Sequence, residues 1–486
     1  MIQVRTQTPE FICDIGDMLR LFLGDVQICE VDGQAAYEHR ILRKNGKIGD
    51  RWSHGDRAYT LWGDAPTGTD VQIRRARKRQ VKMALYELLK QITGMQPPWG
   101  ALTGIRPTRL LYEGLDMGLS LPEARARLKT EFDVSEDRAQ LLCDIADMQR
   151  GVRSVPDGMF DLYIGIPFCR TRCSYCSFSS GEIGRNGKLV APYTQALLHE
   201  IEASAQLIRE ANLRVRAAYI GGGTPTAIPC HDLEAILAAA QREFPDAVEW
   251  TVEAGRPDTI DREKLIMLRA HDVSRISVNP QTFNDETLAR IGRMHTGEDT
   301  VRAYMRAREL GFDDINMDLI AALPGETPEI FADTVRRVIE LAPESVTVHS
   351  LAIKRSSKLH EQLHVSGAGH TQVSSEGAAE MIAFARRSLM DAGWRPYYLY
   401  RQKYMAGNLE NVGYARPGKA CLYNIGNMEE TAPVLALGAG GITKWLFDRD
   451  LRIERAANLK NIEEYINRID EMVERKRALI VPEVKA

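Results

Sequence analysis

The chain has 486 residues, of which 44% are hydrophobic and 27% charged, and its formal net charge is −3. This balance is typical of a globular protein of two or three domains, and it argues against a general nucleic-acid binder, which is usually strongly basic. The first residues are too acidic for a signal peptide, and no run of about 18 apolar residues could span a membrane. We therefore expect a cytoplasmic protein.

Residues 1–155 are predicted to form an N-terminal α+β domain. Tyr37–Trp62 is rich in β-forming residues and contains Asn45-Gly46, a pair typical of a two-residue hairpin turn. Apolar residues at helical spacing follow, and Gly94 and Pro107 stand where a helix should end and the next begin. Three helical regions are expected, over 71–94, 107–118 and 124–149.

Residues 156–352 alternate between short apolar runs and longer amphipathic segments. Strands are expected at Leu162–Ile166, Ala217–Ile220, Glu249–Glu253, Arg275–Val278, Ile315–Ile320 and Ser345–Leu351. Helices are expected between them at Pro192–Ala211, Asp232–Phe244, Asp261–Ala270, Thr300–Leu310 and Pro328–Leu341. This order predicts an α/β fold with a parallel sheet, a partial (β/α)6 barrel whose chemistry lies at the C-terminal ends of the strands.

Residues 353–486 do not continue this repeat and are predicted to form a C-terminal α+β extension. A helix is expected at Thr371–Gly393 and an edge strand or strand pair at Arg395–Lys403. A glycine-rich stretch, Leu437–Ile442, follows, and Ile462–Arg477 is predicted to be one amphipathic helix.

Three of the eight cysteines, Cys169, Cys173 and Cys176, lie within eight residues just after the first barrel strand. In a reducing compartment such clustering indicates metal or redox chemistry rather than disulfides. Three thiolates on one loop suit a 4Fe-4S cluster with one iron left open for another ligand. A structural zinc site would normally offer four protein ligands, so zinc completed by a distant histidine is the alternative.

Polar or glycine residues follow the next strands of the repeat. The second strand ends in a glycine-rich Gly-Gly-Gly-Thr-Pro-Thr turn, whose backbone could approach a ligand closely. Any one of these polar residues, taken alone, would be interpreted as an ordinary capping residue. Their shared position at strand ends, however, is what a barrel site requires. The residues are Gly222, Gly223, Thr224, Glu253, Gln281, Asp318 and, twelve residues after Gln281, Arg293.

The C-x3-C-x2-C spacing, with aromatic Tyr175 before the third cysteine, resembles the radical S-adenosylmethionine (radical SAM) superfamily. The resemblance implies a 4Fe-4S cluster on Cys169, Cys173 and Cys176, with S-adenosylmethionine on the open iron. One electron then cleaves S-adenosylmethionine, and the 5′-deoxyadenosyl radical takes a hydrogen atom from the substrate. An electron donor such as flavodoxin or ferredoxin is implied as a partner.

Over about residues 160–445 the motifs resemble the oxygen-independent coproporphyrinogen III oxidase family and its relatives. By this resemblance the glycine motif, with Gly223 and Thr224, meets the amino end of S-adenosylmethionine, and the region around Val348 faces its adenosine. The same resemblance implies a pocket lined by Tyr163, Gly222, Glu253, Gln281, Arg293, Asp318 and Ile320.

The segment Trp99–Arg109 resembles the HemZ-type coproporphyrinogen dehydrogenase branch of this family. The implied enzyme decarboxylates two propionates of coproporphyrinogen III to vinyl groups in porphyrin and haem biosynthesis, giving protoporphyrinogen IX. An anionic tetrapyrrole needs cations, and arginine binds carboxylates in a bidentate manner. Arg106 and Arg109 are the candidate substrate residues, beside a basic run at 74–82 that could equally be a solvated helix face.

Three positions depart from the relatives. The oxidases carry a histidine where this chain has Gly165, and a further cysteine where it has Phe178. The related haem chaperones carry a His-Asn pair near Cys421–Asn424, where no histidine stands here. A haem-binding chaperone and a radical SAM enzyme for another tetrapyrrole or an unrelated anionic substrate remain the alternatives.

Overall fold

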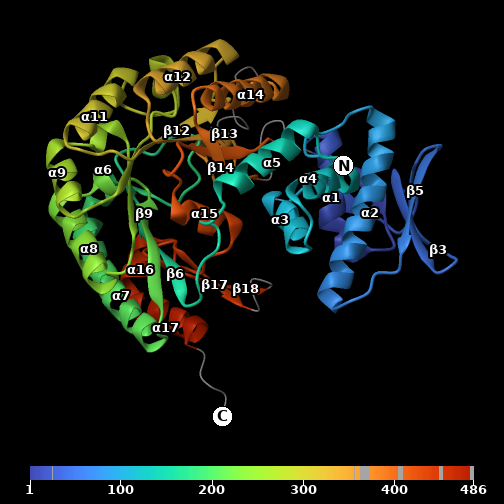
Figure 1. The fold of residues 1–486 in the computed structure, drawn as a ribbon, viewed down its shortest axis with the longest axis horizontal. Coiled ribbons are helices and arrows are strands. Elements are labelled where there is room, and N and C mark those ends of the chain that lie inside the picture. The colour runs from blue at the N-terminus through green and yellow to red at the C-terminus, as the bar shows by residue number, and fades with distance from the viewer. Residues whose placement is uncertain are drawn as a thin grey trace. The chain divides into compact units, whose positions relative to one another are not determined.

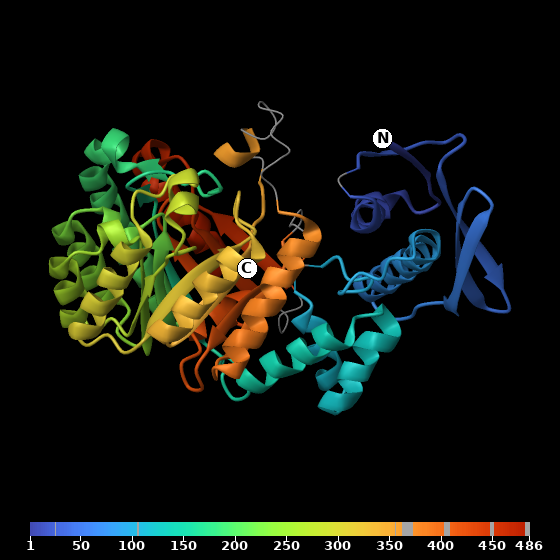
Figure 2. The ribbon, with the colours of Figure 1, turned by 90° about the horizontal axis from the view of Figure 1, so that it is seen from above.

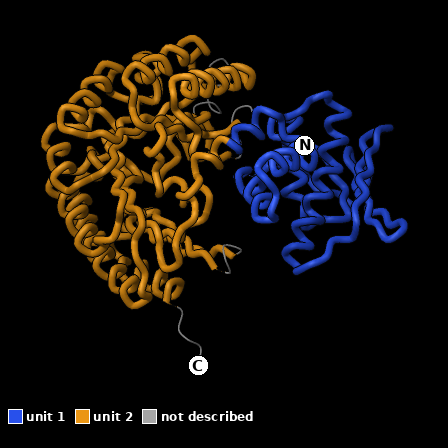
Figure 3. The backbone as a smooth tube through the Cα atoms, viewed as in Figure 1, with its two compact units in different colours: residues 1–143 blue, residues 144–486 orange. Residues whose placement is uncertain are grey.

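The computed structural model describes residues 1–24, 26–104, 106–354, 356–361, 373–402, 409–447 and 452–481. The chain divides into two compact units, Met1–Cys143 and Asp144–Ala486, shown in Figure 3. The division into three parts at residues 155 and 352 stays a prediction. No helix within the described ranges is long and apolar enough to cross a membrane.

Unit 1 contains a five-stranded sheet in the order β2-β1-β3-β4-β5. The predicted hairpin is present, because Asn45 and Gly46 both take positive φ angles, 51° and 76°, in the two-residue turn that joins β3 to β4. The strands are β1 (Ile2–Arg5), β2 (Ile28–Glu30), β3 (Tyr37–Lys44), β4 (Lys47–His54) and β5 (Arg57–Asp64).

The helices of unit 1 lie in the three predicted regions, and one further helix precedes them. The third region, 124–149, is divided into two helices by Asp133, whose φ of 56° ends the first of them. Thr69 caps the long second helix through a reciprocal pair with Gln72, and Gly94 ends it in the left-handed conformation. That helix packs its buried face, including Leu85 and Leu88, against the sheet and the first helix. The helices are α1 (Ile12–Leu23), α2 (Asp70–Thr93), α3 (Thr108–Asp116), α4 (Leu121–Phe132) and α5 (Glu136–Met148), which reaches into unit 2.

Unit 2 is built on the predicted repeat. Six parallel strands lie side by side in chain order, which confirms the predicted strand sequence: β6 (Met159–Ile166), β9 (Arg214–Gly222), β10 (Glu249–Gly255), β11 (Arg275–Val278), β12 (Ile315–Ala321) and β13 (Ser345–Ser350). Figures 1 and 2 show the connecting helices as an outer layer around the curved sheet. These helices are α7 (Val190–Glu210), α8 (Cys230–Glu243), α9 (Arg262–Ala270), α10 (Asp285–Arg290), α11 (Gly297–Glu309) and α12 (Pro328–Leu341).

The C-terminal region extends this sheet at both edges, to eleven strands. β15 (Asn411–Ala415) joins β13 in antiparallel fashion, and β14 (Arg395–Tyr400) forms the outermost strand, as predicted for its described part. At the other edge β16 (Val434–Leu437) pairs in parallel with β6, followed by β17 (Ile442–Phe447) and β18 (Arg452–Ala457).

The C-terminal helices are α14 (Ser375–Asp391), α15 (Leu422–Glu429), α16 (Ile462–Asn467) and α17 (Ile469–Ile480). Residues 371–372 and 403, at the ends of two predicted elements, lie outside the described residues. The prediction of one helix over Ile462–Arg477 is wrong, because Arg468 leaves the helical conformation with φ −127° and separates two helices. Both pieces pack against α7.

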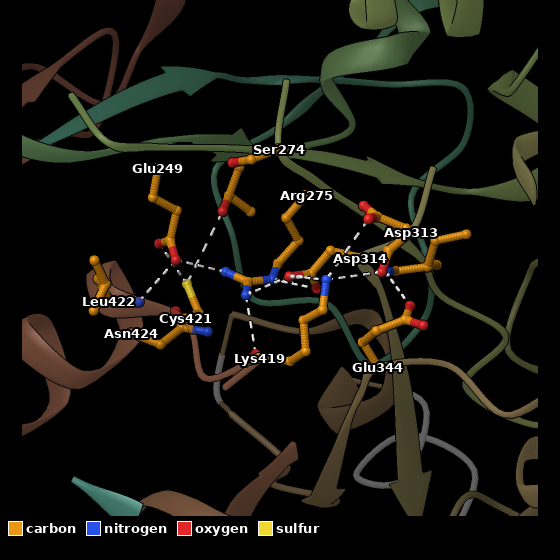
Figure 4. Close-up of polar contacts among 12 residues, drawn as sticks. Glu249, Ser274, Arg275, Asp313, Asp314, Glu344, Lys419, Cys421, Leu422 and Asn424 are labelled. Atoms are coloured by element: carbon orange, nitrogen blue, oxygen red, sulfur yellow. Dashed lines mark hydrogen bonds and ion pairs between the residues drawn. The ribbon is translucent and has the colours of Figure 1, made fainter. Parts of the chain in front are cut away.

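A buried ionic network closes the base of the sheet, at the N-terminal ends of the parallel strands (Figure 4). Arg275 donates to Glu249 at 2.8 Å and, in a bidentate manner, to Asp314 at 3.0 and 2.9 Å. It also donates to the carbonyl of Lys419 at 3.0 Å, and Glu249 accepts the backbone N–H of Leu422 at 3.0 Å. The network therefore holds the segment before α15 to the barrel.

A second buried pair fixes the same segment from the neighbouring strands. Arg216 on β9 donates to both carboxylate oxygens of Asp161 on β6, at 2.9 and 2.7 Å, and to the carbonyl of Leu422 at 2.9 Å. Burial raises the pKa of Asp161 to about 6, against the opposing effect of Arg216. Arg216 and Arg275 thus fix the backbone just before Tyr423, and so determine where this residue enters the barrel.

Replacing Arg275 with methionine should strongly destabilise unit 2, because it leaves Glu249 buried without its cation and Asp314 with only Lys419, at 3.9 Å. We expect the free energy of unfolding to fall by about 3–5 kcal/mol, as for other broken buried ion pairs. Chemical denaturation followed by circular dichroism measures it. The matched control, Arg242→Met on the exposed face of α8, should change stability by less than about 0.5 kcal/mol, and an equal loss in both variants would contradict the role of the network.

Candidate active site

The cysteine loop begins where β6 ends. Cys169 is the last residue of β7 (Phe168–Cys169), which pairs with β8 (Gly181–Glu182), and the other two cysteines lie on the loop between them. Neighbouring elements hold this loop through its backbone. Ser174 donates its N–H to the carbonyl of Ile291 at 3.0 Å, and the Thr171 hydroxyl donates to the carbonyl of Gly292 at 3.1 Å.

All eight cysteines are free thiols. Burial raises the pKa values of Cys169 and Cys176, and each of these thiols also interacts electrostatically with Cys173. Within the described part of the chain, no three Cys, His, Asp or Glu side chains are already arranged around one ion position. By donor type, proximity and shared loop, the three thiols fit the three protein ligands of a cubane cluster, whose binding would release their protons.

The glycine motif after β9 packs directly on the entry to this loop. Gly223 donates its N–H to the carbonyl of Ile166 at 2.9 Å, and Thr224 donates to that of Phe168 at 2.7 Å. A Cβ atom on Gly223 would lie 2.5 Å from the Phe168 carbonyl oxygen, so only glycine permits this backbone approach. The Thr224 hydroxyl reaches the Cys169 sulfur at 3.7 Å. The predicted motif and the predicted loop are therefore in contact.

A carboxylate and stacked tyrosines lie beside the motif. The Tyr219 hydroxyl donates to Glu253 at 2.6 Å, and the Tyr163 ring stacks near Tyr219 with centroids 6.4 Å apart. Burial raises the pKa of Glu253 to about 7, and the charge of Asp318 acts in the same direction. A cationic group bound here would lower that pKa and make the carboxylate the stable form.

Gln281, which follows β11, lies beside Asp318 and Ile320, which belong to the middle and C-terminal half of β12. Gln281 takes a positive φ of 66°, a conformation that is uncommon outside glycine, and donates its N–H to the carbonyl of Asp318 at 2.9 Å. Ile320 donates back to the carbonyl of Gln281 at 3.0 Å. Asn316 donates to the Asp318 carboxylate at 2.8 Å and so orients it.

Arg293 joins the strand ends to the cysteine loop. Its guanidinium donates to the carbonyl of Asn279 at 2.6 Å and to the hydroxyl of Tyr175, the aromatic residue before Cys176, at 3.3 Å. Arg293 is buried, and its contacts explain why an arginine twelve residues beyond Gln281 belongs to the same site.

Several polar residues of the barrel interior were not predicted from the sequence. Tyr219 precedes Gly221 by two residues, so strand alternation puts both on one face, and this signal was available. His349 on β13 lies 4.0 Å from Asp318 and 3.3 Å from the Tyr400 hydroxyl. Tyr423, whose ring is 4.7 Å from that of Tyr219, comes from the C-terminal region and had no local signal.

The three positions at which this chain departs from its relatives lie in different parts of unit 2. A Cβ on Gly165 would lie 3.5 Å from the carbonyl oxygen of Leu437, so the glycine-rich turn after β16 covers this position. Phe178 is exposed to solvent, at 66%. The Cys421 thiol is buried and donates to Glu249 at 3.2 Å, which makes this stretch part of the basal network.

The basic run on α2 is largely engaged within unit 1. Arg77 forms a bidentate pair with buried Asp50 at 2.9 and 2.8 Å, and Lys78 lies 3.4 Å from Asp14. These two cations therefore have partners within unit 1, and Arg77, whose side chain is 15% exposed, is not part of a solvated face. Arg106 and Arg109 lie in unit 1 and the cysteine loop in unit 2, and their binding of substrate stays a prediction.

Adding a methyl group at Gly223 should disrupt the cysteine loop, since the Phe168 carbonyl must move. We expect Gly223→Ala protein, after anaerobic iron and sulfide reconstitution, to hold less than half of the wild-type iron at unchanged helix content. Gly187→Ala is the matched control, because a Cβ there meets no atom within 4 Å. Wild-type iron content in Gly223→Ala would show that the close approach does not shape the loop.

Comparison with known proteins gives a consistent result. Residues 163–338 match the model of the radical SAM superfamily. The oxygen-independent coproporphyrinogen-III oxidase-like protein HemZ of Bacillus subtilis is 38% identical over 421 residues, 85% of this chain and 83% of its own. The heme chaperone HemW of Bacillus subtilis is 35% identical over 40% of this chain and 51% of its own.

Among solved structures, coproporphyrinogen III oxidase (HemN) from Escherichia coli matches with a TM-score of 0.53 and 25% identity, over 70% of this chain and 74% of its own. The superfamily uses a 4Fe-4S cluster bound by three cysteines together with S-adenosylmethionine, and the cysteine loop supplies that number of thiols. The chain belongs to the radical SAM superfamily and, within it, to the oxygen-independent coproporphyrinogen III oxidase-like proteins of the HemZ type.

Proposed function

We propose that this protein decarboxylates two propionate side chains of coproporphyrinogen III to vinyl groups, giving protoporphyrinogen IX without oxygen. The observation that carries the proposal is the 38% identity to HemZ across 85% of the chain. The convergence of the strand-end residues on the cysteine loop supports it from the geometry. The cluster ligands are Cys169, Cys173 and Cys176, and the S-adenosylmethionine pocket is formed by the strand-end residues named above.

When bound, the cluster supplies the electron that cleaves S-adenosylmethionine into methionine and the hydrogen-abstracting radical. The protein's own residues bind and orient the reactants. Glu253 and the exposed backbone of the glycine motif offer acceptors for an amine, and its ammonium charge would favour the ionised Glu253 carboxylate. Asp318, oriented by Asn316, offers acceptors for hydroxyl groups, and Arg293 holds the loop through Tyr175.

Two other activities remain in the proposal as alternatives. Because the chain is similar to HemW, haem binding without turnover is one alternative. However, the stretch Cys421–Asn424 contains no histidine, and the Cys421 thiol is hydrogen-bonded to Glu249. A radical SAM reaction on another tetrapyrrole would use the same pocket. Anaerobic incubation with S-adenosylmethionine, reductant and coproporphyrinogen III, read by mass spectrometry, distinguishes them: loss of two CO2 and four hydrogens supports our proposal, whereas haem binding without turnover supports a chaperone.

The cluster assignment predicts about four irons per reconstituted chain. Replacing Cys169, Cys173 or Cys176 with alanine should abolish the cluster's absorption and most of the iron, because three thiolates are the minimum protein ligand set. Cys143→Ala is the control, because it removes a buried thiol of unit 1 that lies outside the cysteine loop, and it should leave the iron content unchanged. One equivalent of zinc without labile sulfide would instead support the zinc alternative.

Charge reversal at Arg106 or Arg109 tests the substrate residues. Loss of one charge-assisted carboxylate contact costs about 1.5–3 kcal/mol, so binding of the porphyrinogen should weaken about ten- to a hundredfold or more. Cleavage of S-adenosylmethionine without substrate should not change, since it needs only the pocket of unit 2. Normal porphyrinogen turnover in a stable variant would exclude these arginines, and equal loss of both activities would indicate a structural role.

A further inference from the structure

The sheet of unit 1 has one covered face and one open face. Strand alternation turns Ile48, Asp50 and Trp52 of β4 inward, where they are buried. Trp52 donates its indole N–H to the carbonyl of Val81 on α2 at 3.1 Å, so α2 covers this inner face. Figures 1 and 2 show α2 on one side of the strands and no described helix of unit 1 on the other. We call the side chains that point away from α2 on β3, β4 and β5 the outer sheet face. The members that matter here are Arg40, Lys44, Lys47, Arg51, Thr60 and Trp62.

Trp62 is a flat aromatic platform on this outer sheet face. It lies opposite Gly49 across the pair of β4 and β5, and it is 41% exposed. A Cβ atom on Gly49 would lie 2.9 to 3.0 Å from three neighbouring atoms of the six-membered ring, so the ring lies flat across the glycine. One ring face therefore packs on backbone and the other faces solvent, which is the arrangement on which an unpaired nucleic-acid base stacks.

Cations flank Trp62 in both directions along the strands. Lys44 lies opposite Lys47 on the hairpin side of the tryptophan, and Arg40 lies opposite Arg51 on the other side. Like charges directly opposite each other destabilise a sheet. A bound anion removes this repulsion, so the arrangement favours an anionic ligand.

Three of these cations have no acidic partner. Lys44, Lys47 and Arg51 form no ion pair with any residue that the structure describes. Asp64 lies opposite Lys47 at the end of β5 but forms no ion pair with it.

The fourth cation, Arg40, shares its partner. Arg40 lies 3.6 Å from Glu38, and Glu38 also accepts a hydrogen bond of 2.5 Å from Arg5 on β1. One carboxylate thus serves two arginines, and the charge of the outer sheet face is positive.

We propose that the outer sheet face binds single-stranded RNA, with Trp62 stacking on a base and the flanking cations contacting phosphates. The net charge of −3 argues against a general nucleic-acid binder, whereas this positive charge is local to one sheet face. The inference is independent of the proposed reaction, because it needs neither the cysteine loop nor S-adenosylmethionine.

The extent of the charge favours a polymer over one small anion. Lys47 and Arg5 stand at the levels of Lys44 and Glu38 on β3, which are about 20 Å apart along the strand. That length suits a strand of about four nucleotides or more, the smallest site size of single-strand-binding folds. Thr60 lies opposite Arg51 and places a hydroxyl beside a phosphate-binding guanidinium, where it can hydrogen-bond to the 2′-hydroxyl that distinguishes RNA from DNA.

The first test measures stacking by fluorescence anisotropy of a labelled oligouridylate of about 12 nucleotides with the full-length protein. At low salt we expect Trp62→Ala to weaken binding by about fivefold or more, because one base loses its stacking partner. Trp62→Phe should keep most of the affinity. The RNA should also quench tryptophan fluorescence of the wild type, and this quenching should disappear in Trp62→Phe although that variant binds.

The second test measures the phosphate contacts. Lys47→Glu/Arg51→Glu should weaken binding by about tenfold or more at low salt, and the slope of log K against log salt should become shallower by about 1.4 because two phosphate contacts are lost. The matched control is Arg214→Glu/Arg262→Glu, which reverses two exposed arginines of unit 2 that form no ion pair with a described residue. It should bind RNA like the wild type.

The proposal is overturned if the wild type does not bind the oligouridylate, or if Trp62→Ala and Lys47→Glu/Arg51→Glu both keep wild-type affinity. It is also overturned by an RNA duplex, or a DNA strand of the same sequence, that binds as tightly as the single-stranded RNA. Coproporphyrin III that displaces the RNA and loses its own binding in the same variants would instead assign the face to a tetrapyrrole.

Discussion

The close backbone contact between the glycine motif and the end of β6 is the constraint on which the site depends. Gly223 and Thr224 donate to carbonyls of the strand and loop that lead to Cys169, and no side chain fits between them. Two parallel strands whose last paired residues, Ile166 and Gly222, are 56 positions apart in the chain thus meet at their C-terminal ends. This contact therefore sets the distance between the cysteine loop on one side of the edge and the carboxylates of the neighbouring strands on the other.

The charged side chains inside unit 2 form two groups, one at the N-terminal ends and one at the C-terminal ends of the parallel strands. At the base, Arg216 and Arg275 neutralise Asp161, Glu249 and Asp314, so those charges are satisfied by the protein itself. At the C-terminal edge, Glu253 accepts hydrogen bonds from one tyrosine hydroxyl and one backbone N–H, and no cation among the residues that the structure describes pairs with it. Burial raises its pKa to about 7, and the charge of Asp318 acts in the same direction.

The C-terminal region does more than extend the sheet. It delivers Tyr423 to the stack with Tyr219, and it brings Tyr400 to His349 beside Asp318. Tyr400 and Tyr423 both come from the segment that follows the six-stranded repeat.

The sequence by itself determined the repeat, the cysteine loop and the strand-end residues, because strand and helix periodicities are local and C-x3-C-x2-C is a short motif. Six strands and their order were predictable for this reason, and the Asn45-Gly46 hairpin likewise. Only the tertiary structure showed that Arg293 contacts Tyr175 and that Tyr219 donates a hydrogen bond to Glu253. It likewise showed that Arg77 and Lys78 form ion pairs within unit 1. Those contacts join residues far apart in the chain, and their partners are set by strand register and by packing of helices, which no single segment encodes. The break at Arg468 was likewise not predicted, since continuous amphipathicity predicts one helix, whereas the structure has two helices that both pack on α7.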